Sequence, residues 1–228
     1  MLDYLHKILF SYYPYVALTI FFVGSIYRYE TNQYSWKSSS SQIFRRDYLF
    51  WGSNLFHIGI LILIFGHFFG LLTPKFIYSI FISPENKQII AMVVGGIAGI
   101  FCLIGLFMLL YRRLSDLRVR SNSNTSDIFI LFLLLIQLIL GLFTTFISYQ
   151  HLDNPSSMIA LAGWVQGIVT FSPDLSSFII NEHYLFKLHL FFGMTILLVF
   201  PFTRLVHIFS FPYLYFLRTG FQIVRKLR

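Results

Sequence analysis

Four histidines lie inside two of the most apolar stretches of the chain. His57 and His67 fall within "NLFHIGILILIFGHFFG" (54–70), and His189 and His207 fall within a second stretch near the C-terminus. Ionisable side chains at bilayer depth are costly, rare and usually functional. Imidazole is a ligand for zinc, copper and iron. The pattern therefore indicates metal binding inside a membrane.

The composition places the chain among membrane proteins. Hydrophobic residues make up 57% of the 228 residues and charged residues only 11%, whereas about 25% of a soluble domain is charged. The mean hydropathy is +0.72. The single cysteine, Cys102, excludes a disulfide framework and a cysteine-ligated zinc or iron–sulfur site within the chain. We expect membrane lipid around the chain and no nucleic acid partner.

Five stretches are long enough to cross a bilayer as helices, which takes about 20 residues each. We therefore predict an all-α integral membrane protein, one membrane domain over residues 1–228 with a cytoplasmic tail at 210–228. Pro14 is tolerated in the first turn of the first span, and the connection 149–182 contains a segment typical of an interfacial amphipathic helix. The predicted spans are residues 13–28, 49–72, 89–111, 127–148 and 185–209.

The Lys and Arg residues near the ends of the spans predict the orientation of the bundle. Twelve of them gather on one side, in residues 28–46, 112–120 and 218–228, against four on the opposite side. The N-terminus is therefore expected outside and the C-terminus in the cytoplasm, as in a multi-pass protein of the cell inner membrane.

This topology pairs the four buried histidines by depth. The second and fifth spans run antiparallel, which brings His57 and His207 to the inner side and His67 and His189 to the outer side. His189 and His207 are five full helical turns apart, so we expect them to share one face of the fifth span. The rises between the histidines, about 15 Å on the second span and about 27 Å on the fifth, do not match. Helix tilt absorbs only part of that difference.

Two facing imidazoles at each depth fit haem better than a bare ion. A bare zinc site takes three or four ligands at one depth, whereas a haem iron needs only axial ligands beside its macrocycle. We therefore expect two stacked haem b groups. Several glycines either make room for a flat ring or allow close helix packing, namely Gly52, Gly59, Gly66, Gly70 and Gly193.

Other histidines and basic residues are secondary candidates. His183 is the main rival of His189 as the outer ligand, although it lies at the membrane edge, where a solvated side chain is expected. His6 and His151 also lie at or beyond span ends. Arginines at the inner side are candidates for the haem propionates, although positive-inside topology explains the last two equally well: Arg204, Arg112 and Arg113.

Several motifs connect the chain to a known family. The most specific are "NLFHIGI", "GHFFGLLTP" and "RLVHI", supported by "SYYPYVALTIFFVGSIYRYE" and "KLHLFFGMT". Over nearly its whole length the chain resembles the gamma subunit of respiratory, membrane-bound nitrate reductase, a diheme cytochrome b. In that family the residues that match His57 and His207 bind the inner haem, and those that match His67 and His189 bind the outer haem.

The resemblance also implies an activity and partners. The family's quinol oxidation site lies beside the outer haem and includes the positions that match Gly66, His67 and Lys87. Electrons from menaquinol or ubiquinol would then pass to a cytoplasmic iron–sulfur beta subunit. That subunit feeds a molybdenum-containing alpha subunit, which reduces nitrate in anaerobic respiration. The chain would be the quinol-oxidising subunit of this enzyme complex.

Two of these roles have ordinary alternatives. A lysine at the start of a span, such as Lys87, often snorkels to the membrane surface. The tail "FPYLYFLRTGFQIVRKLR" has the composition of a membrane-surface anchor. We favour a mixed role in which Tyr213, Tyr215 and Arg218 also contact the beta subunit.

Two other functions stay open at this point. A cytochrome b of another quinone-linked oxidoreductase would have the same haem sites and different partner subunits. A proton-linked transporter with a histidine relay is a function of another class, but such transporters usually show internal repeats and broken helices. A haem absorption band and the identity of co-purifying subunits discriminate among the three.

Overall fold

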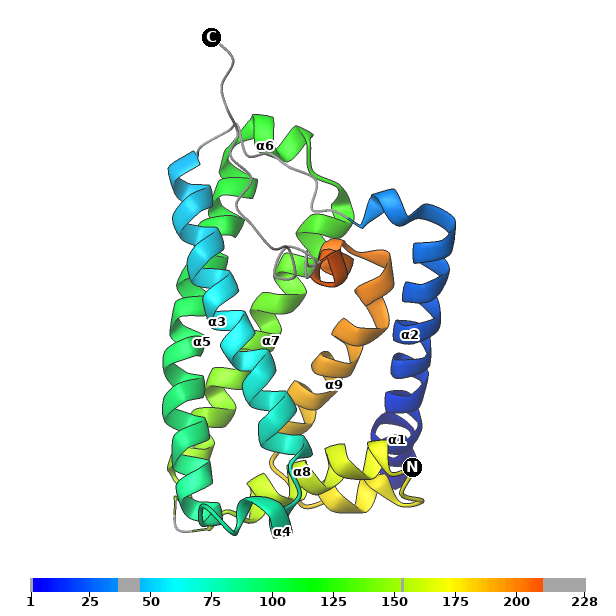
Figure 1. Cartoon of the computed structure of the whole chain (residues 1–228), viewed down its shortest axis with the longest axis vertical. Helices are drawn as coiled ribbons and strands as arrows, with labels where there is room; N and C mark the ends of the chain where they lie inside the picture. The colour runs from blue at the N-terminus through cyan, green and yellow to red at the C-terminus, as the bar shows by residue number, and fades with distance from the viewer. Residues whose placement is uncertain (1, 37–45, 153, 211–228) are drawn as a thin grey trace, which may run out of the picture.

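The computed structural model describes residues 2–36, 46–152 and 154–210, and this part of the chain folds into a helical bundle (Figure 1). Within it, five helices are long and apolar enough to cross a membrane, over Asp3–Ser35, Tyr48–Leu72, Pro84–Ser115, Thr125–Tyr149 and Tyr184–Phe202. The prediction of an all-α protein with five spans is therefore confirmed.

The first span begins earlier than the sequence predicts. It consists of α1 (Leu2–Lys7), a π-helical turn η1 (Ile8–Tyr12) and α2 (Tyr13–Asn32), followed by the short η2 (Gln33–Ser35). Pro14 lies in the first turn of α2, as the sequence predicts, but the π turn and α1 extend the span before it. Proline lacks an N–H and clashes with the preceding turn of an α-helix, and the wider π turn directly before it accommodates this defect.

Helices α3 (Arg46–Leu72) and α5 (Pro84–Ser115) approach each other closely along glycines. A Cβ atom at Gly59 would lie 2.6 Å from the carbonyl oxygen of Ala98, and one at Gly105 would collide with the backbone of Phe56. A Cβ at Gly52 would lie 3.0 Å from the Cβ of Met108. Helix packing thus explains Gly52 and Gly59, two of the glycines that were candidates for making room for a ring.

Gly105→Ala is expected to destabilise the protein by about 1–3 kcal/mol, because the added methyl group must push apart two packed backbones. Thermal unfolding of the detergent-solubilised protein measures the change. Gly95→Ala is the matched control, since a Cβ at Gly95 on the same helix meets no atom within 4 Å. Equal unfolding midpoints for the two variants would show that the glycine contact is not tight.

The remaining helices complete the bundle. α7 (Thr125–Tyr149) packs against α5, and α9 (Tyr184–Val199) lies between α7 and α2. α8 (Ser156–Val169) crosses one end of the bundle beside α4 (Lys75–Tyr78), and we name this the α8 end (Figure 1). The opposite end, next to α6 (Leu117–Ser121), carries Arg28, Arg112, Arg113 and Arg204, and we name it the arginine end.

α8 is fastened to the bundle by buried side chains. The indole N–H of the fully buried Trp164 donates to the carbonyl oxygen of Phe10, at 2.9 Å, within the π turn. The Gln166 amide donates to the carbonyl oxygens of Leu71 and Thr73, at 2.8 and 3.3 Å. These two carbonyl groups lie at the C-terminal end of α3, where backbone acceptors find no donor within the helix. α8 therefore fixes the end of the helix that carries His57 and His67.

The fifth span is not a continuous helix. The sequence predicts one helix over 185–209, but α9 ends at Val199, because Pro201 cannot donate to the preceding turn. The chain continues as η4 (Phe200–Phe202) and η5 (Arg204–Ser210), which turns across the bundle axis (Figure 1). The assumption that His189 and His207 share one face of a straight helix is therefore wrong.

This break removes the mismatch between the two histidine spacings. His189 is ten residues from the end of α9 at Val199, the same separation as between His57 and His67. Both helical segments therefore rise about 15 Å along the bundle. Beyond Val199 the chain turns across the bundle axis and advances no further along it. His207 reaches the level of His57 from the side.

A candidate double histidine centre

The structure brings the four histidines of the two apolar spans together as two pairs. The ring centroids of His57 and His207 are 6.2 Å apart, and those of His67 and His189 are 6.1 Å apart. The first pair lies nearer the arginine end and the second nearer the α8 end. Each pair joins α3 to the chain segment that runs from α9 into η5, as the depth argument from the sequence expects.

The spacing within each pair suits a metal ion between two imidazoles. No hydrogen bond joins the two rings of either pair within the described residues. Two metal–imidazole bonds of about 2 Å each, with the distance from each bonding nitrogen to its ring centre added, give about 6 Å between centroids. Among the described residues no three His, Cys, Asp or Glu side chains come together to hold a bare ion. Each pair therefore offers two imidazole ligands, which is the number of protein ligands that a haem iron takes.

Backbone carbonyls fix the tautomer of three of the four rings. Nδ1 of His57 lies 2.7 Å from the carbonyl oxygen of Ser53, and Nδ1 of His67 lies 2.7 Å from that of Leu63. Nδ1 of His207 lies 2.6 Å from the carbonyl oxygen of Arg204. A carbonyl only accepts, so each Nδ1 must carry the proton, which leaves a lone pair on Nε2. This is the usual support of a metal-binding histidine.

His189 has a different environment, formed by two residues of α7 that the sequence did not single out. The Gln137 amide lies 3.3 Å from Nε2 of His189, while Nδ1 of His189 is buried without a hydrogen-bond partner in the described part of the chain. A Cβ at Gly141 would lie 3.0 Å from Cε1 of the same ring. Gly141 thus lets the ring lie against α7. Gln137 is a polar side chain in the middle of an apolar span, and this feature could have identified it from the sequence.

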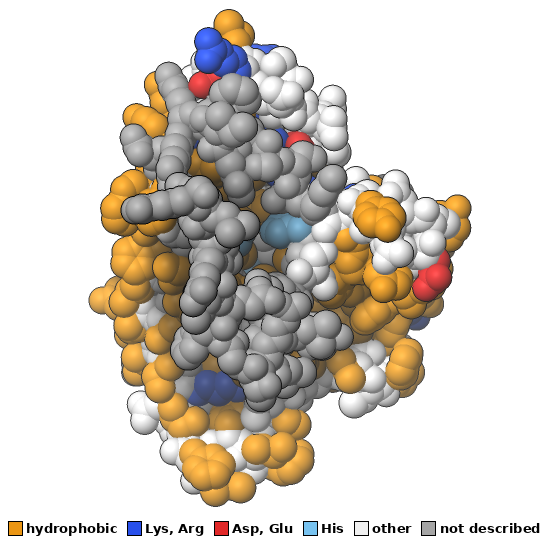
Figure 2. Space-filling view, turned by 45° about the horizontal axis from the view of Figure 1, so that its top comes forward, with side chains coloured by type: hydrophobic (Ala, Val, Ile, Leu, Met, Phe, Trp, Pro, Cys, Tyr) orange, Lys and Arg blue, Asp and Glu red, His pale blue; other side chains and the backbone are white. Residues whose placement is uncertain are grey.

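The histidine side of α3 is free of close helix packing. Only 6% of the most apolar part of this helix is buried, since α3 packs chiefly against α5 and, at its end, against α8. Cβ atoms at Gly66 and Gly70 would meet nothing within 4 Å. Figure 2, which looks partly onto the arginine end, shows histidine side chains near the middle of this face. The face of α3 beside His67 is therefore open at Gly66 and Gly70.

Lys87 is placed at the α8 end, at the start of α5. Its Nζ is buried, has no hydrogen-bond acceptor among the described residues, and lies 3.6 Å from the centroid of the Tyr78 ring. Burial and the nearby Glu85 carboxylate raise the pKa of Tyr78, so its phenol stays neutral and its ring face is available to a cation. A buried ammonium with three donors and no acceptor is rare, and it is turned toward the protein. No described contact joins Lys87 to His67.

At the arginine end, a buried carboxylate holds two of the three candidate arginines. Asp127 pairs with Arg113 at 3.1 Å and with Arg204 at 3.7 Å. Arg113 also donates to the Ser123 hydroxyl, and Arg112 is buried beside it. Asp127 was not among the residues that the sequence singled out. An acidic residue in the first turn of a span, where the helix dipole favours it, was the signal for it.

The remaining histidines stay apart from the two pairs. Nδ1 of His183 accepts from the backbone N–H of Leu185 and so caps the start of α9. His151 lies just beyond α7 and is exposed, while His6 contacts the Phe10 ring in the first span. The tail residues Tyr213, Tyr215 and Arg218 lie outside the described residues.

The comparisons with known proteins agree on one family. Residues 6–227 match the family model described as nitrate reductase gamma subunit. The chain is 50% identical to the respiratory nitrate reductase 2 gamma chain of Escherichia coli, over all of both chains. It is 46% identical to the respiratory nitrate reductase 1 gamma chain of the same organism, over 98% of this chain and 99% of the relative. The nitrate reductase gamma chain of Bacillus subtilis is 39% identical, over 96% of this chain and 98% of its own.

Five apolar helices and these relatives together make the chain a multi-pass protein of the inner membrane. The matched region includes all four paired histidines, Lys87 and the arginines. The chain therefore belongs to the nitrate reductase gamma subunit family.

Proposed function

We propose that this chain is a diheme cytochrome b that oxidises membrane quinol and delivers the electrons to the other subunits of a respiratory nitrate reductase. One observation carries the proposal, which is that α3 and the α9–η5 segment face each other through two imidazole pairs of equal spacing. Family membership supplies the class of enzyme.

His57 and His207 would hold the inner haem, and His67 and His189 the outer haem. When bound, haem supplies reversible one-electron transfer. The carbonyl oxygens that accept from Nδ1 of His57, His67 and His207 orient these three rings and leave Nε2 free to bind the iron. Arg112 and Arg204 are the better candidates for the inner propionates, because Arg113 makes the shorter pair with Asp127.

Quinol oxidation would take place beside the outer pair, at Gly66, His67 and Lys87. Oxidation of quinol to quinone releases two electrons and two protons. The Lys87 ammonium would donate a hydrogen bond to a quinol oxygen and stabilise the negative charge on that oxygen as its proton departs. Its Nζ has no acceptor among the described residues, which supports this role. Gly66 carries no side chain that would occupy the space beside His67.

The distribution of Lys and Arg supports an orientation with the arginine end in the cytoplasm and the α8 end outside. Protons from quinol would then be released outside while electrons leave on the inside. The partners would be an iron–sulfur beta subunit and a molybdenum-containing alpha subunit. Turnover with menaquinol or ubiquinol would thus build a proton gradient.

The complex purified from membranes tests this proposal. We expect a b-type haem band, two haems per chain, reduction of both by a quinol analogue, and co-purification of iron–sulfur and molybdenum subunits. Absence of a haem band would refute the proposal and favour a histidine-relay transporter. Haem together with different partner subunits would instead show a cytochrome b of another quinone-linked complex.

A further inference from the structure

The break after α9 leaves backbone carbonyls that need donors. The last carbonyl groups of a helix find no N–H donor within the helix, and a buried carbonyl without a donor is costly. Pro201 and Thr203 lie directly after the break and are both buried. The segment that carries His207 therefore depends on donors from elsewhere in the bundle.

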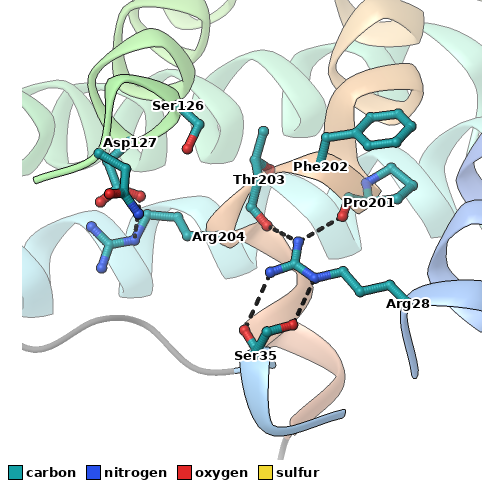
Figure 3. Close-up of a pocket in the computed structure, with 9 residues that line it drawn as sticks. Arg28, Ser35, Ser126, Asp127, Pro201, Phe202, Thr203 and Arg204 are labelled. Atoms are coloured by element: carbon teal, nitrogen blue, oxygen red, sulfur yellow. Dashed lines mark hydrogen bonds and ion pairs between the residues drawn. The ribbon is translucent and has the colours of Figure 1, made fainter. Parts of the chain in front are cut away.

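Arg28 supplies these donors from α2. One of its guanidinium nitrogens, Nη1, donates to the carbonyl oxygen of Pro201 at 2.6 Å and to that of Thr203 at 2.8 Å. Nε and Nη2 donate to the hydroxyl and the carbonyl of Ser35, at 3.0 and 3.2 Å. Figure 3 shows the guanidinium between the broken helix end and Ser35, beside a pocket of about 530 Å³. Every contact uses the planar fork that distinguishes arginine from lysine.

A second contact fixes the same junction against α2. A Cβ at Gly24 would lie 2.9 Å from Cγ of Pro201, so the two segments are in close contact. Gly24 and Arg28 are four residues apart and lie on one face of α2. The position of Pro201 is thus set by packing, and the direction of the chain after it is set by hydrogen bonds.

The junction leads directly to the inner histidine. Arg204 follows Thr203, and its carbonyl oxygen accepts from Nδ1 of His207 at 2.6 Å. Its side chain pairs with Asp127 of α7 at 3.7 Å. A displacement of Thr203 therefore moves the acceptor that orients the His207 ring.

We propose that Arg28 is a positioning residue for the inner haem, because it holds the turn that presents His207 to His57. The proposal rests on the proposed function, since it takes the His57–His207 pair as haem ligands. Outside that role, an arginine at the end of a span would only anchor the bundle by its charge. Arg28 instead donates its hydrogen bonds to the junction and to Ser35.

The test measures haem loss from each site in the purified complex, with an excess of a haem-scavenging apoprotein. His207→Ala and His67→Ala first assign the spectral signals of the inner and outer haems. In Arg28→Gln we expect the inner haem to leave about tenfold faster or more, as when the support of a metal ligand is removed. The outer haem should leave at the wild-type rate. Arg28→Lys should lie between the two, because an ammonium keeps the charge without the fork.

Arg118→Gln is the matched control, since it removes an exposed guanidinium from the same end of the bundle. An inner haem that behaves alike in Arg28→Gln and in this control would overturn the proposal. Equal acceleration at both sites would overturn it too, by showing that Arg28 only stabilises the bundle. If Arg28→Gln does not accumulate, Arg28→Lys decides, through the inner low-spin haem signal against the outer one. A wild-type complex without haem would refute the proposed function itself, which is a separate outcome.

Discussion

His57→Ala and His207→Ala are each expected to abolish the same spectral component, while His67→Ala and His189→Ala abolish the other. Each pair shares one site, because their ring centroids are only 6.2 and 6.1 Å apart. Loss of a ligand should lower haem affinity by more than the 10- to 100-fold typical of losing a ligand's support. Optical and EPR spectra of membranes measure the two haems separately.

His151→Ala is the control for this series, since this exposed residue lies just beyond α7 and outside both pairs. Both haems should remain in that variant. His183→Ala should also keep both haems, because its ring caps α9 and faces no other histidine. If His57→Ala and His207→Ala removed different components, the pairing would be wrong.

Lys87→Met is expected to slow quinol oxidation by about 100-fold while both haems remain bound. Removal of one donor to a developing oxyanion typically costs this much. Methionine keeps the approximate length of the side chain and removes the charge. The measurement is the rate of haem reduction by a quinol analogue in membranes, with the haem content determined first.

Two controls separate the role of Lys87 from general damage. Dithionite, which needs no quinol site, should reduce both haems equally well in the variant. Lys75→Met removes a cation from α4, at the same end of the bundle, and should leave the rate unchanged. Reduction of Lys87→Met at the wild-type rate would show that Lys87 only anchors α5. Acidification of the inner compartment by quinol protons would contradict the proposed orientation.

The sequence was sufficient to predict the five spans and the meeting of the histidines by depth. Long apolar runs report membrane helices directly, because few residue types are tolerated at bilayer depth. The antiparallel course of α3 and α9 then leaves one way to match His57 and His67 with His189 and His207. Both inferences use only the direction and the order of the spans.

Side-chain detail could not be predicted in the same way. The straight-helix geometry of residues 185–209 failed at Pro201, whose effect depends on donors that α2 supplies through Arg28. The use of Gly59 could not be decided either, because it depends on which neighbour packs against that face. Pairings such as Arg113 with Asp127 link different helices, and one sequence carries no signal for them.

Because α3 is sparsely packed, haem bound at the proposed sites would contribute to the folding equilibrium. α3 packs against α5 and α8, and it faces the α9–η5 segment through the two histidine pairs. A ligand that binds only the folded state stabilises it by about 4 kcal/mol at a thousandfold excess over its dissociation constant. Two haems between these segments would therefore stabilise the folded bundle by linking α3 to the α9–η5 segment. In a cell short of haem, the amount of intact subunit would be set by haem synthesis and by proteolysis of chains whose α3 is not yet tied to α9.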